Sequence, residues 1–308
     1  MDTNKNKNFA CDIETGLCAP TANDGIEEIN LNASGKVKLI YYTDPICSAC
    51  WAIEPELKKF KLAYGDFVDI EYKMGGLLPG WEGFADKSNG IAKPSDVAHH
   101  WDEVGAYTGM SIDGDVWLED PLSSSFPPSI AFKAMQKQGE AIALAFLRNI
   151  REMVFLEKKN ITKEAFLLKA VDNCGGDAKQ FLVDYHDETV KQSFYDEIEA
   201  GRKMGVRGFP TFIFVGKEGK GFKISGMSGY DNYVKALEKA FGEKITAAPI
   251  SFTELDLLKK YRYLATKEIT FILSKEEAQV VLVLAELVKK GLLKQEKQKF
   301  GDFWRLVE

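Results

Sequence analysis

Two cysteines separated by two residues stand where a predicted strand turns into a predicted helix. Cys47 and Cys50 follow an apolar run at residues 37–42, which is typical of a buried strand. Apolar residues at helical spacing come directly after them. At such a turn the first cysteine lies against the free N–H groups of the helix N-terminus, which favour thiolate over thiol. A thiolate attacks disulfides and a second cysteine resolves the mixed disulfide, so the pair predicts redox chemistry.

A zinc site is the main alternative for these thiols. Cys11 and Cys18 would complete a set of four thiolates with Cys47 and Cys50. Zinc-binding cysteine pairs usually have two to four intervening residues, however, and six residues separate Cys11 from Cys18. We therefore expect no metal and no cofactor. Cys11 and Cys18 are two idle thiols, an auxiliary redox pair that exchanges with the main pair, or a regulatory metal clip.

The composition is that of an ordinary globular protein. The chain has 308 residues, of which 45% are hydrophobic and 28% charged, and its net charge is −6. It has no apolar stretch long enough to cross a membrane, and its first residues contain no apolar core of a secretory signal. We expect a cytoplasmic protein with no membrane and no nucleic-acid partner. In that compartment a C-x-x-C pair is more often reactive than structural.

The order of predicted elements indicates an α/β fold with a mixed sheet. Two strands with a helix between them favour parallel pairing, and two later strands are close enough for an antiparallel hairpin. Pro55 should kink the first helix without ending it. The predicted elements are a strand at 36–43, a helix at 51–64, a strand at 67–74, a helical stretch at about 94–200, strands at 210–216 and 220–225, and a helix at 230–241.

This order divides the chain into parts. A flexible tail is expected at 1–35, an α/β domain at 36–93 and 204–242, an inserted helical domain at 94–203, and a small C-terminal domain at 252–308. In the last domain two or three helices precede a hairpin, which suggests a winged-helix-like unit. Its helix at 275–290 is too apolar and acidic for a DNA groove. We expect this unit to contact a protein or to dimerise.

Three features together resemble the thioredoxin superfamily. They are the C-x-x-C pair at the turn, the helix proline Pro55, and the Gly-Phe-Pro-Thr run at 208–211. The long helical stretch before that run resembles the DsbA branch with its inserted helical domain. The runs Asp-Pro-Ile-Cys-Ser-Ala-Cys-Trp at 44–51 and Gly-Gly-Leu-Leu-Pro at 75–79 resemble the intracellular FrnE-like and YjbH-type Clp-adaptor relatives.

The resemblance implies roles for individual residues. Cys47 would be the nucleophile, Cys50 the resolving thiol, and Pro210 a cis-proline that faces them. The residue before that proline offers backbone hydrogen bonds to an extended substrate in this family, and here it is Phe209. The expected substrate-binding surface also includes Pro45, Trp51 and Trp81.

Two functions of different classes remain. The first is a cytosolic thiol–disulfide oxidoreductase that acts on protein or peptide thiols and disulfides. We expect it to be reductase- or isomerase-like, because Ser48 and Ala49 leave no histidine between the cysteines. The second is a redox-sensing adaptor or regulator that binds a protein partner, for example for proteolysis. The intact cysteine pair favours the enzyme, and the appended C-terminal unit favours the adaptor.

Overall fold

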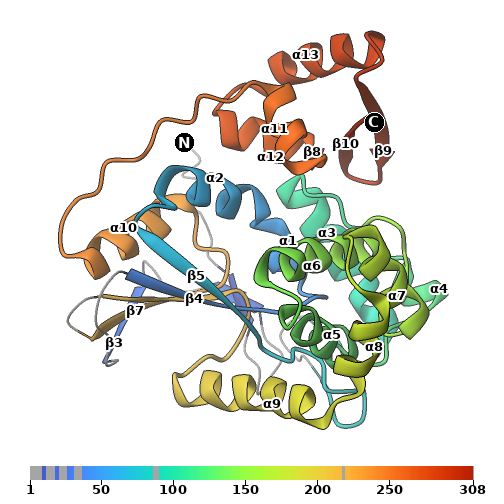
Figure 1. Cartoon of the computed structure of the whole chain (residues 1–308), viewed down its shortest axis with the longest axis vertical. Helices are drawn as coiled ribbons and strands as arrows, with labels where there is room; N and C mark the ends of the chain where they lie inside the picture. The colour runs from blue at the N-terminus through green and yellow to red at the C-terminus, as the bar shows by residue number, and fades with distance from the viewer. Residues whose placement is uncertain are drawn as a thin grey trace.

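The computed structural model of the chain describes residues 9–11, 18–20, 26–30, 37–85, 90–216 and 219–307. Within these ranges the chain forms a five-stranded sheet, a group of helices inserted after its second parallel strand, and a small C-terminal unit (Figure 1). This arrangement confirms the predicted α/β class, with a helical insertion and a C-terminal antiparallel sheet.

The central sheet is mixed, with the strand order β3-β7-β6-β4-β5. Strands β4 and β5 are parallel, because α1 (Ser48–Ala52) and α2 (Glu54–Tyr64) cross over between them, and the other neighbours are antiparallel. In chain order the strands are β3 (Ile26–Asn30), β4 (Val37–Thr43), β5 (Val68–Met74), β6 (Thr211–Val215) and β7 (Lys220–Ser225).

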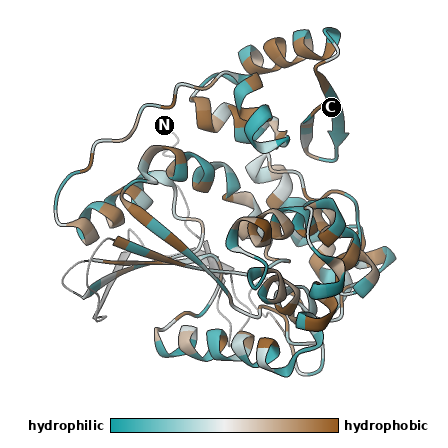
Figure 2. Ribbon diagram, in the orientation of Figure 1, coloured by the Kyte–Doolittle hydropathy of each residue, from teal (hydrophilic) through white to brown (hydrophobic). Residues whose placement is uncertain are grey.

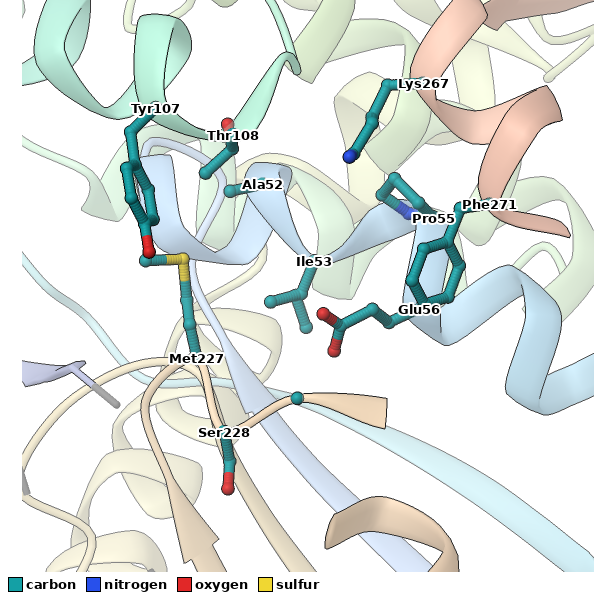
Figure 3. Close-up of a pocket in the computed structure, with 11 residues that line it drawn as sticks. Ala52, Ile53, Pro55, Glu56, Tyr107, Thr108, Met227, Ser228, Lys267 and Phe271 are labelled. Carbon is teal, nitrogen blue, oxygen red and sulfur yellow. The ribbon is translucent and has the colours of Figure 1, made fainter. Parts of the chain in front are cut away.

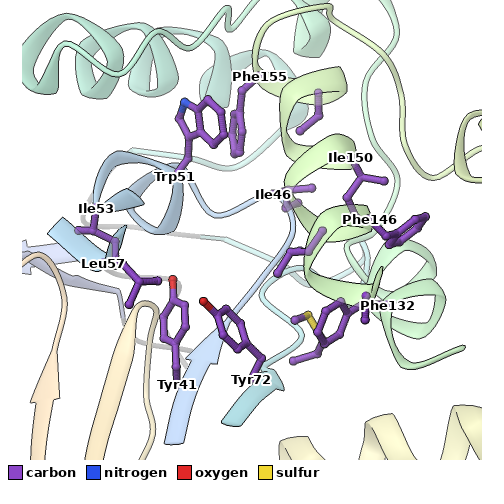
Figure 4. Packing of buried hydrophobic residues seen from close by; sticks show 14 of the residues in the cluster. Tyr41, Ile46, Trp51, Ile53, Leu57, Tyr72, Phe132, Phe146, Ile150 and Phe155 are labelled. Carbon is purple, nitrogen blue, oxygen red and sulfur yellow. The ribbon is translucent and has the colours of Figure 1, made fainter. Parts of the chain in front are cut away.

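Helices cover both faces of this sheet. Helices α2 (Glu54–Tyr64) and α10 (Tyr230–Phe241) lie on one face, and α9 (Glu188–Lys203) lies on the other (Figure 1). Aromatic residues of the sheet fill the space below α2: the ring of Tyr41 stacks on Phe212 at 4.5 Å and meets Tyr72 edge-on at 5.1 Å (Figure 4). Their burial supplies much of the hydrophobic stabilisation of this layer.

The inserted part is helical, as predicted. Asp177 precedes the inserted helix Ala178–His186 and accepts hydrogen bonds from the backbone N–H groups of Lys179 and Gln180. The helices are α3 (Pro94–Thr108), α4 (Val116–Glu119), α5 (Phe126–Gln136), α6 (Glu140–Phe155), α7 (Glu164–Asn173) and α8 (Ala178–His186).

Pro55 acts differently from the prediction. The helix after the cysteines is divided into α1 (Ser48–Ala52) and α2, with Ile53 between them, so the helix is interrupted and not merely kinked. Pro55 lies in the first turn of α2, where a missing N–H costs no helical hydrogen bond. The break gives the cysteine turn a short helix of its own.

The C-terminal unit has a separate core. Its buried residues include Leu257, Leu284 and Trp304, whose indole N–H donates to the Thr266 hydroxyl at 2.8 Å. Three helices pack on a sheet of order β8-β10-β9, which agrees with the winged-helix-like prediction, although β8 was not foreseen. The elements are α11 (Glu254–Tyr261), β8 (Tyr263–Ala265), α12 (Thr266–Leu273), α13 (Glu277–Lys289), β9 (Leu293–Gln298) and β10 (Gly301–Leu306).

The N-terminal stretch contains strands where the sequence predicted a flexible tail. β1 (Phe9–Cys11) pairs antiparallel with β2 (Cys18–Pro20), and β3 pairs with β7 at the edge of the central sheet. The pairing of β3 depends on a partner strand far along the chain, which local sequence patterns do not encode.

Hydrophobic residues concentrate in the interior of this architecture. Hydrophobic and hydrophilic residues alternate along β5, whereas the hairpin of β9 and β10 is largely hydrophilic (Figure 2). None of the helices in the described ranges is long and apolar enough to cross a bilayer.

Candidate functional site

The cysteine turn has the local geometry that the sequence predicts. Cys47 is the N-cap of α1, directly after β4 and a short turn. Its Sγ accepts a hydrogen bond from the backbone N–H of Cys50 at 3.1 Å. The sulfur of Cys47 therefore stands at the positive end of a helix, which on its own favours the thiolate.

Burial works against this local effect. Cys47 is 2% exposed and Cys50 is fully buried. Both lie in one cluster with Phe209 and Ile213. The ring of Phe209 rests against Gly75, where a Cβ atom would lie only 1.8 Å from it. Glycine at 75 thus permits a bulky aromatic residue to pack beside the thiols.

The two thiols have different acidities. Burial, together with the hydrogen bond to Cys50, raises the pKa of the Cys47 thiol well above its usual value. Burial also acts on Cys50, but the hydrogen bond from Cys47 and the positive charge of Arg151 outweigh it, so the pKa of Cys50 is lowered. The more acidic thiol is thus the fully buried one.

Pro210 follows a cis peptide bond from Phe209. Its carbonyl accepts a hydrogen bond from the backbone N–H of Gly226 at 2.7 Å, and the Thr211 hydroxyl donates to the Gly208 carbonyl at 2.7 Å. These bonds tie the start of β6 to its neighbours. The roles of Cys47, Cys50, Phe209 and Pro210 toward a substrate stay predictions.

Arg151 is a site residue that the sequence analysis missed. It is 1% exposed, and its guanidinium donates to the Thr43 hydroxyl at 2.5 Å, to the Asp44 carbonyl at 3.2 Å and to the Glu54 carboxylate at 2.9 Å. A signal existed, since Arg151 occupies an apolar position of α6 beside Ile150 and Val154. A charge at such a position usually has a buried partner.

Asp44 holds the turn before Cys47. Its carboxylate accepts from the backbone N–H groups of Ile46 at 3.0 Å and Leu77 at 2.8 Å, and from the Ser125 hydroxyl at 2.8 Å. Burial raises its pKa to about 6, although these hydrogen bonds oppose the shift. The turn, the loop after β5 and the insertion are thereby joined at one carboxylate.

The predicted substrate-binding residues do not form one surface. Pro45 and Trp51 are buried. The Trp51 indole N–H donates to the Ser111 carbonyl at 3.0 Å. Trp81 donates to the Leu122 carbonyl at 2.8 Å and packs edge-on against Trp117 in the insertion at 5.8 Å, away from the cluster that contains the cysteines.

The C-terminal unit reaches the cysteine turn through Trp51. The Phe303 ring of β10 stacks on Trp51 at 6.2 Å, the Phe155 ring of α6 stacks on it at 5.5 Å (Figure 4), and the Arg148 guanidinium lies 4.5 Å from its centre. Arg148 in turn binds both oxygens of Glu268 in α12, at 2.8 and 3.0 Å. The residue after Cys50 is therefore enclosed by three parts of the chain.

A pocket of about 310 Å³ opens where α2, α3 and α12 meet. The carboxylate of Glu56 and the ammonium group of Lys267 both extend into it, beside Met227 and Phe271 (Figure 3). Oε2 of Glu56 has no hydrogen-bond partner among the described residues. Burial raises the pKa of Glu56 to about 7, while Tyr233 and Lys267 oppose the shift.

The remaining cysteines are separate from this site. The Cα atoms of Cys11 and Cys18 lie opposite each other in the β1–β2 pair, and their side chains lie outside the described part of the structure. Cys174 ends α7 and donates to the Val171 carbonyl. Within the described ranges, no three histidine, cysteine or acidic side chains gather as a metal site.

Comparison with known families agrees with this geometry. The family model described as thioredoxin matches residues 41–235, which include the cysteine turn, the insertion and the cis-proline strand. The chain belongs to the thioredoxin family. The match covers more than half of the 308 residues and stops before the C-terminal unit.

Similarity to individual thioredoxin-family proteins extends further along the chain. It is 34% identical to the ClpXP adapter protein SpxH of Halalkalibacterium halodurans over 97% of both chains. It is 32% identical to SpxH of Bacillus subtilis over 87% of this chain and 89% of that protein. These matches include the C-terminal unit as well as the thioredoxin-like part.

Solved structures show the same fold at lower identity. A disulfide isomerase-like protein from Nitrosomonas europaea superimposes with a TM-score of 0.58 at 18% identity, over 67% of this chain and 97% of that one. The cytosolic disulfide reductase DsbM from Pseudomonas aeruginosa gives 0.52 at 22% identity, over 66% and 97%. These likenesses concern the fold alone.

The expectation of a thiol–disulfide oxidoreductase is therefore corrected. Relatives that match nearly the whole chain are named as adapter proteins of a protease, and not as oxidoreductases. The physical reason that the sequence misled is that a C-x-x-C at a helix N-terminus predicts local acidity but not burial. In this fold Cys47 is covered and its pKa is raised.

Proposed function

We propose that the chain is an adapter protein that binds a client protein and presents it to the ClpXP protease. The observation that carries this proposal is the 34% identity over 97% of both lengths with a ClpXP adapter protein. An adapter needs two protein-binding surfaces and no chemical step. The proposal keeps the cytoplasmic location and the protein partners that the sequence predicted.

The C-terminal unit supports the proposal. The family model matches the thioredoxin-like part and ends at residue 235, whereas the similarity to the adapter proteins continues into the C-terminal unit. The unit has its own core and docks on α2 and on Trp51. An additional folded unit gives the chain a second surface for a protein partner.

We propose further that the thiol pair reports the redox state of the cell. Hydrogen peroxide would oxidise the pair: a bond forms between Sγ of Cys47 and Sγ of Cys50, the O–O bond breaks and takes up the two electrons, and the two thiol hydrogens leave with the hydrogens and oxygens of the peroxide as two water molecules. The pair lies beside Trp51, whose ring stacks on Phe303 of the C-terminal unit. The new disulfide bond would therefore alter how Trp51 packs against that unit. Delivery of the client would then depend on oxidant.

Trapping in cells tests the adapter proposal. A ClpP variant without its catalytic serine retains proteins that ClpX has translocated. We expect at least one protein to accumulate in this trap when the full-length chain is present and to be depleted when its gene is deleted. If the trapped proteins are the same with and without the chain, the proposal fails.

A cysteine variant separates the adapter from the redox proposal. Cys47→Ala/Cys50→Ala removes both thiols and replaces them with small apolar groups that suit a buried site. We expect the variant to deliver the trapped protein at the wild-type rate under reducing conditions and to lose the response to peroxide. If the folded variant fails to deliver the protein under reducing conditions, the thiols take part in delivery, and the proposal of an adapter without a chemical step is contradicted. An unchanged peroxide response would contradict the redox proposal.

A further inference from the structure

A cavity lies at the junction of all three parts of the chain. It has a volume of about 540 Å³ and is lined by α2, α6 and the end of α7, together with residues of α11, β8 and β10. Seven of its lining residues are lysine or arginine and two are glutamate. This volume lies in the usual range for small-molecule sites, and such an excess of one charge attracts the opposite charge.

Part of this positive charge is already neutralised by ion pairs. Lys58 and Arg148 both bind Glu268 at 2.8 Å, and Arg151 binds Glu54 at 2.9 Å. These groups belong to the contact between the C-terminal unit and the rest of the chain. They are structural, because each guanidinium or ammonium group already has a carboxylate partner.

A similar pairing holds at the edge of the cavity. Arg305 of β10 binds Glu296 of β9 at 3.0 Å, and Arg148 also binds Glu152 at 2.6 Å. Four cations are thus matched by four carboxylates: Lys58, Arg148, Arg151 and Arg305 by Glu54, Glu152, Glu268 and Glu296.

Lys61 and Lys260 are two of the three remaining cations of the lining, the third being Arg262. Lys61 of α2 donates to the Tyr72 hydroxyl at 2.6 Å, and the ammonium group of Lys260 in α11 lies 5.8 Å from the centre of the Tyr261 ring. Neither makes an ion pair with a carboxylate in the described part of the chain. Burial lowers the pKa of Lys61, but Tyr72 and more distant carboxylates outweigh it, so this pKa is raised and the group is charged.

We propose that this cavity binds a small soluble anion with phosphate or carboxylate groups, which Lys61 and Lys260 contact from opposite sides. The two lysines come from the thioredoxin-like part and from the C-terminal unit, so the anion connects the two parts. Binding stabilises the docked position of the C-terminal unit. This inference does not depend on the adapter function, because binding is measured on the isolated chain.

Titration of the full-length protein with pyrophosphate and with citrate tests the site. We expect saturable binding at about 0.15 M salt, where long-range attraction is screened. Each ligand should also raise the midpoint of thermal unfolding, because it binds only the folded chain. Lys61→Gln/Lys260→Gln should weaken binding about tenfold or more, since each lysine supplies a charge-assisted hydrogen bond.

A matched variant controls for net charge. Lys235→Gln/Lys259→Gln removes two exposed lysines that do not line the cavity. It should bind as the wild type does. Equal weakening in both double variants, an absence of saturable binding in the wild type, or binding that disappears at about 0.15 M salt would each overturn the proposal. Circular dichroism establishes that both variants are folded.

Discussion

Cys47 combines a helix N-terminal position with almost complete burial, and the two features act in opposite directions on its thiol. The helix N-terminus stabilises the thiolate, but this gain in free energy is only a fraction of the cost of removing the thiolate from water. Burial prevails, and the pKa of Cys47 is raised. A thiol of this kind is poorly suited to rapid exchange and is better suited to slow oxidation.

Alkylation measures this directly. We expect iodoacetamide to modify Cys47 in the folded chain at pH 7.5 more than about tenfold more slowly than in the urea-unfolded chain, because both thiolate and access are reduced. Peptide-resolved mass spectrometry distinguishes Cys47 from the other cysteines. If Cys47 is modified equally fast in the folded and the unfolded chain at pH 7.5, the assigned burial and pKa are contradicted.

Glu56 gives stability a pH dependence of known sign. Its pKa is about 7 in the folded chain, above the usual value of 4.5, so the folded chain keeps a proton that the unfolded chain releases. The contribution of Glu56 to the free energy of unfolding therefore falls as pH rises from about 4.5 to about 7 and stays low above pH 7.

Glu56→Gln removes this penalty. At pH 8 we expect the variant to be more stable than the wild type by about 1 to 3 kcal/mol, and at pH 4 to be equally stable, because both side chains are then neutral. Urea unfolding at the two pH values provides the comparison. A variant that is less stable at pH 8 would show that the charged carboxylate has a partner in solution.

At the scale of elements, the loop after β5 packs closely against the residue that precedes Pro210, because Gly75 in this loop has no side chain. A Cβ at Gly75 would lie 1.8 Å from the Phe209 ring. We expect Gly75→Ala to destabilise the wild type by about 1 to 3 kcal/mol, as overpacking does. The cost should be much smaller in a Phe209→Val background, and a double-mutant cycle measures the difference. Equal costs in the two backgrounds would mean that Phe209 does not occupy this place.

Most elements of the central fold follow from local patterns. The apolar run of β4, the alternation of β5 and the proline before β6 were enough to predict the mixed sheet and the position of the cysteine pair. Strand β8 and the pairing of β3 were missed, because each depends on a neighbour far along the chain. The break at Ile53 is a local effect of Pro55, which was expected to cause only a kink.

The residues around the thiols were harder to predict than the thiols themselves. The positions of Cys47, Cys50 and the cis-proline follow from spacing and resemblance. Burial of Cys47 beside Phe209 and the influence of Arg151 on Cys50 arise only after the insertion and the sheet have packed together. Spacing along the sequence carries no information on that packing, and this is why it predicted an enzyme.

At the scale of the whole molecule, buried charges join the C-terminal unit to the rest. Glu268 of α12 is fully buried and accepts hydrogen bonds from Arg148 and from the backbone N–H of Ala265 at 2.8 Å, and it pairs with Lys58. Burial acts to raise the pKa of Glu268, but the positive charges of Arg148 and Lys58 outweigh burial and lower this pKa, so the carboxylate stays charged at neutral pH. The contact is therefore sensitive to loss of either partner.

Glu268→Gln tests this contact. It leaves Arg148 and Lys58 without full compensation, and we expect a loss of about 3 to 5 kcal/mol in stability at pH 7. Hydrogen exchange should show that α11, α12 and α13 lose protection first. The control Glu286→Gln removes an exposed carboxylate of the same unit and should leave stability nearly unchanged. Similar losses in both variants would contradict the assigned importance of Glu268.

The central claim is that the chain is an adapter, and degradation by purified ClpXP tests it most directly. The rate is measured for a protein recovered from the ClpP trap, with and without the full-length chain, under reducing conditions. The account predicts at least about tenfold faster degradation with the chain, an effect of about 1.4 kcal/mol on the delivery step. It also predicts the same acceleration by Cys47→Ala/Cys50→Ala. An unchanged rate with the wild-type chain, or acceleration that requires the two thiols under these conditions, would contradict it.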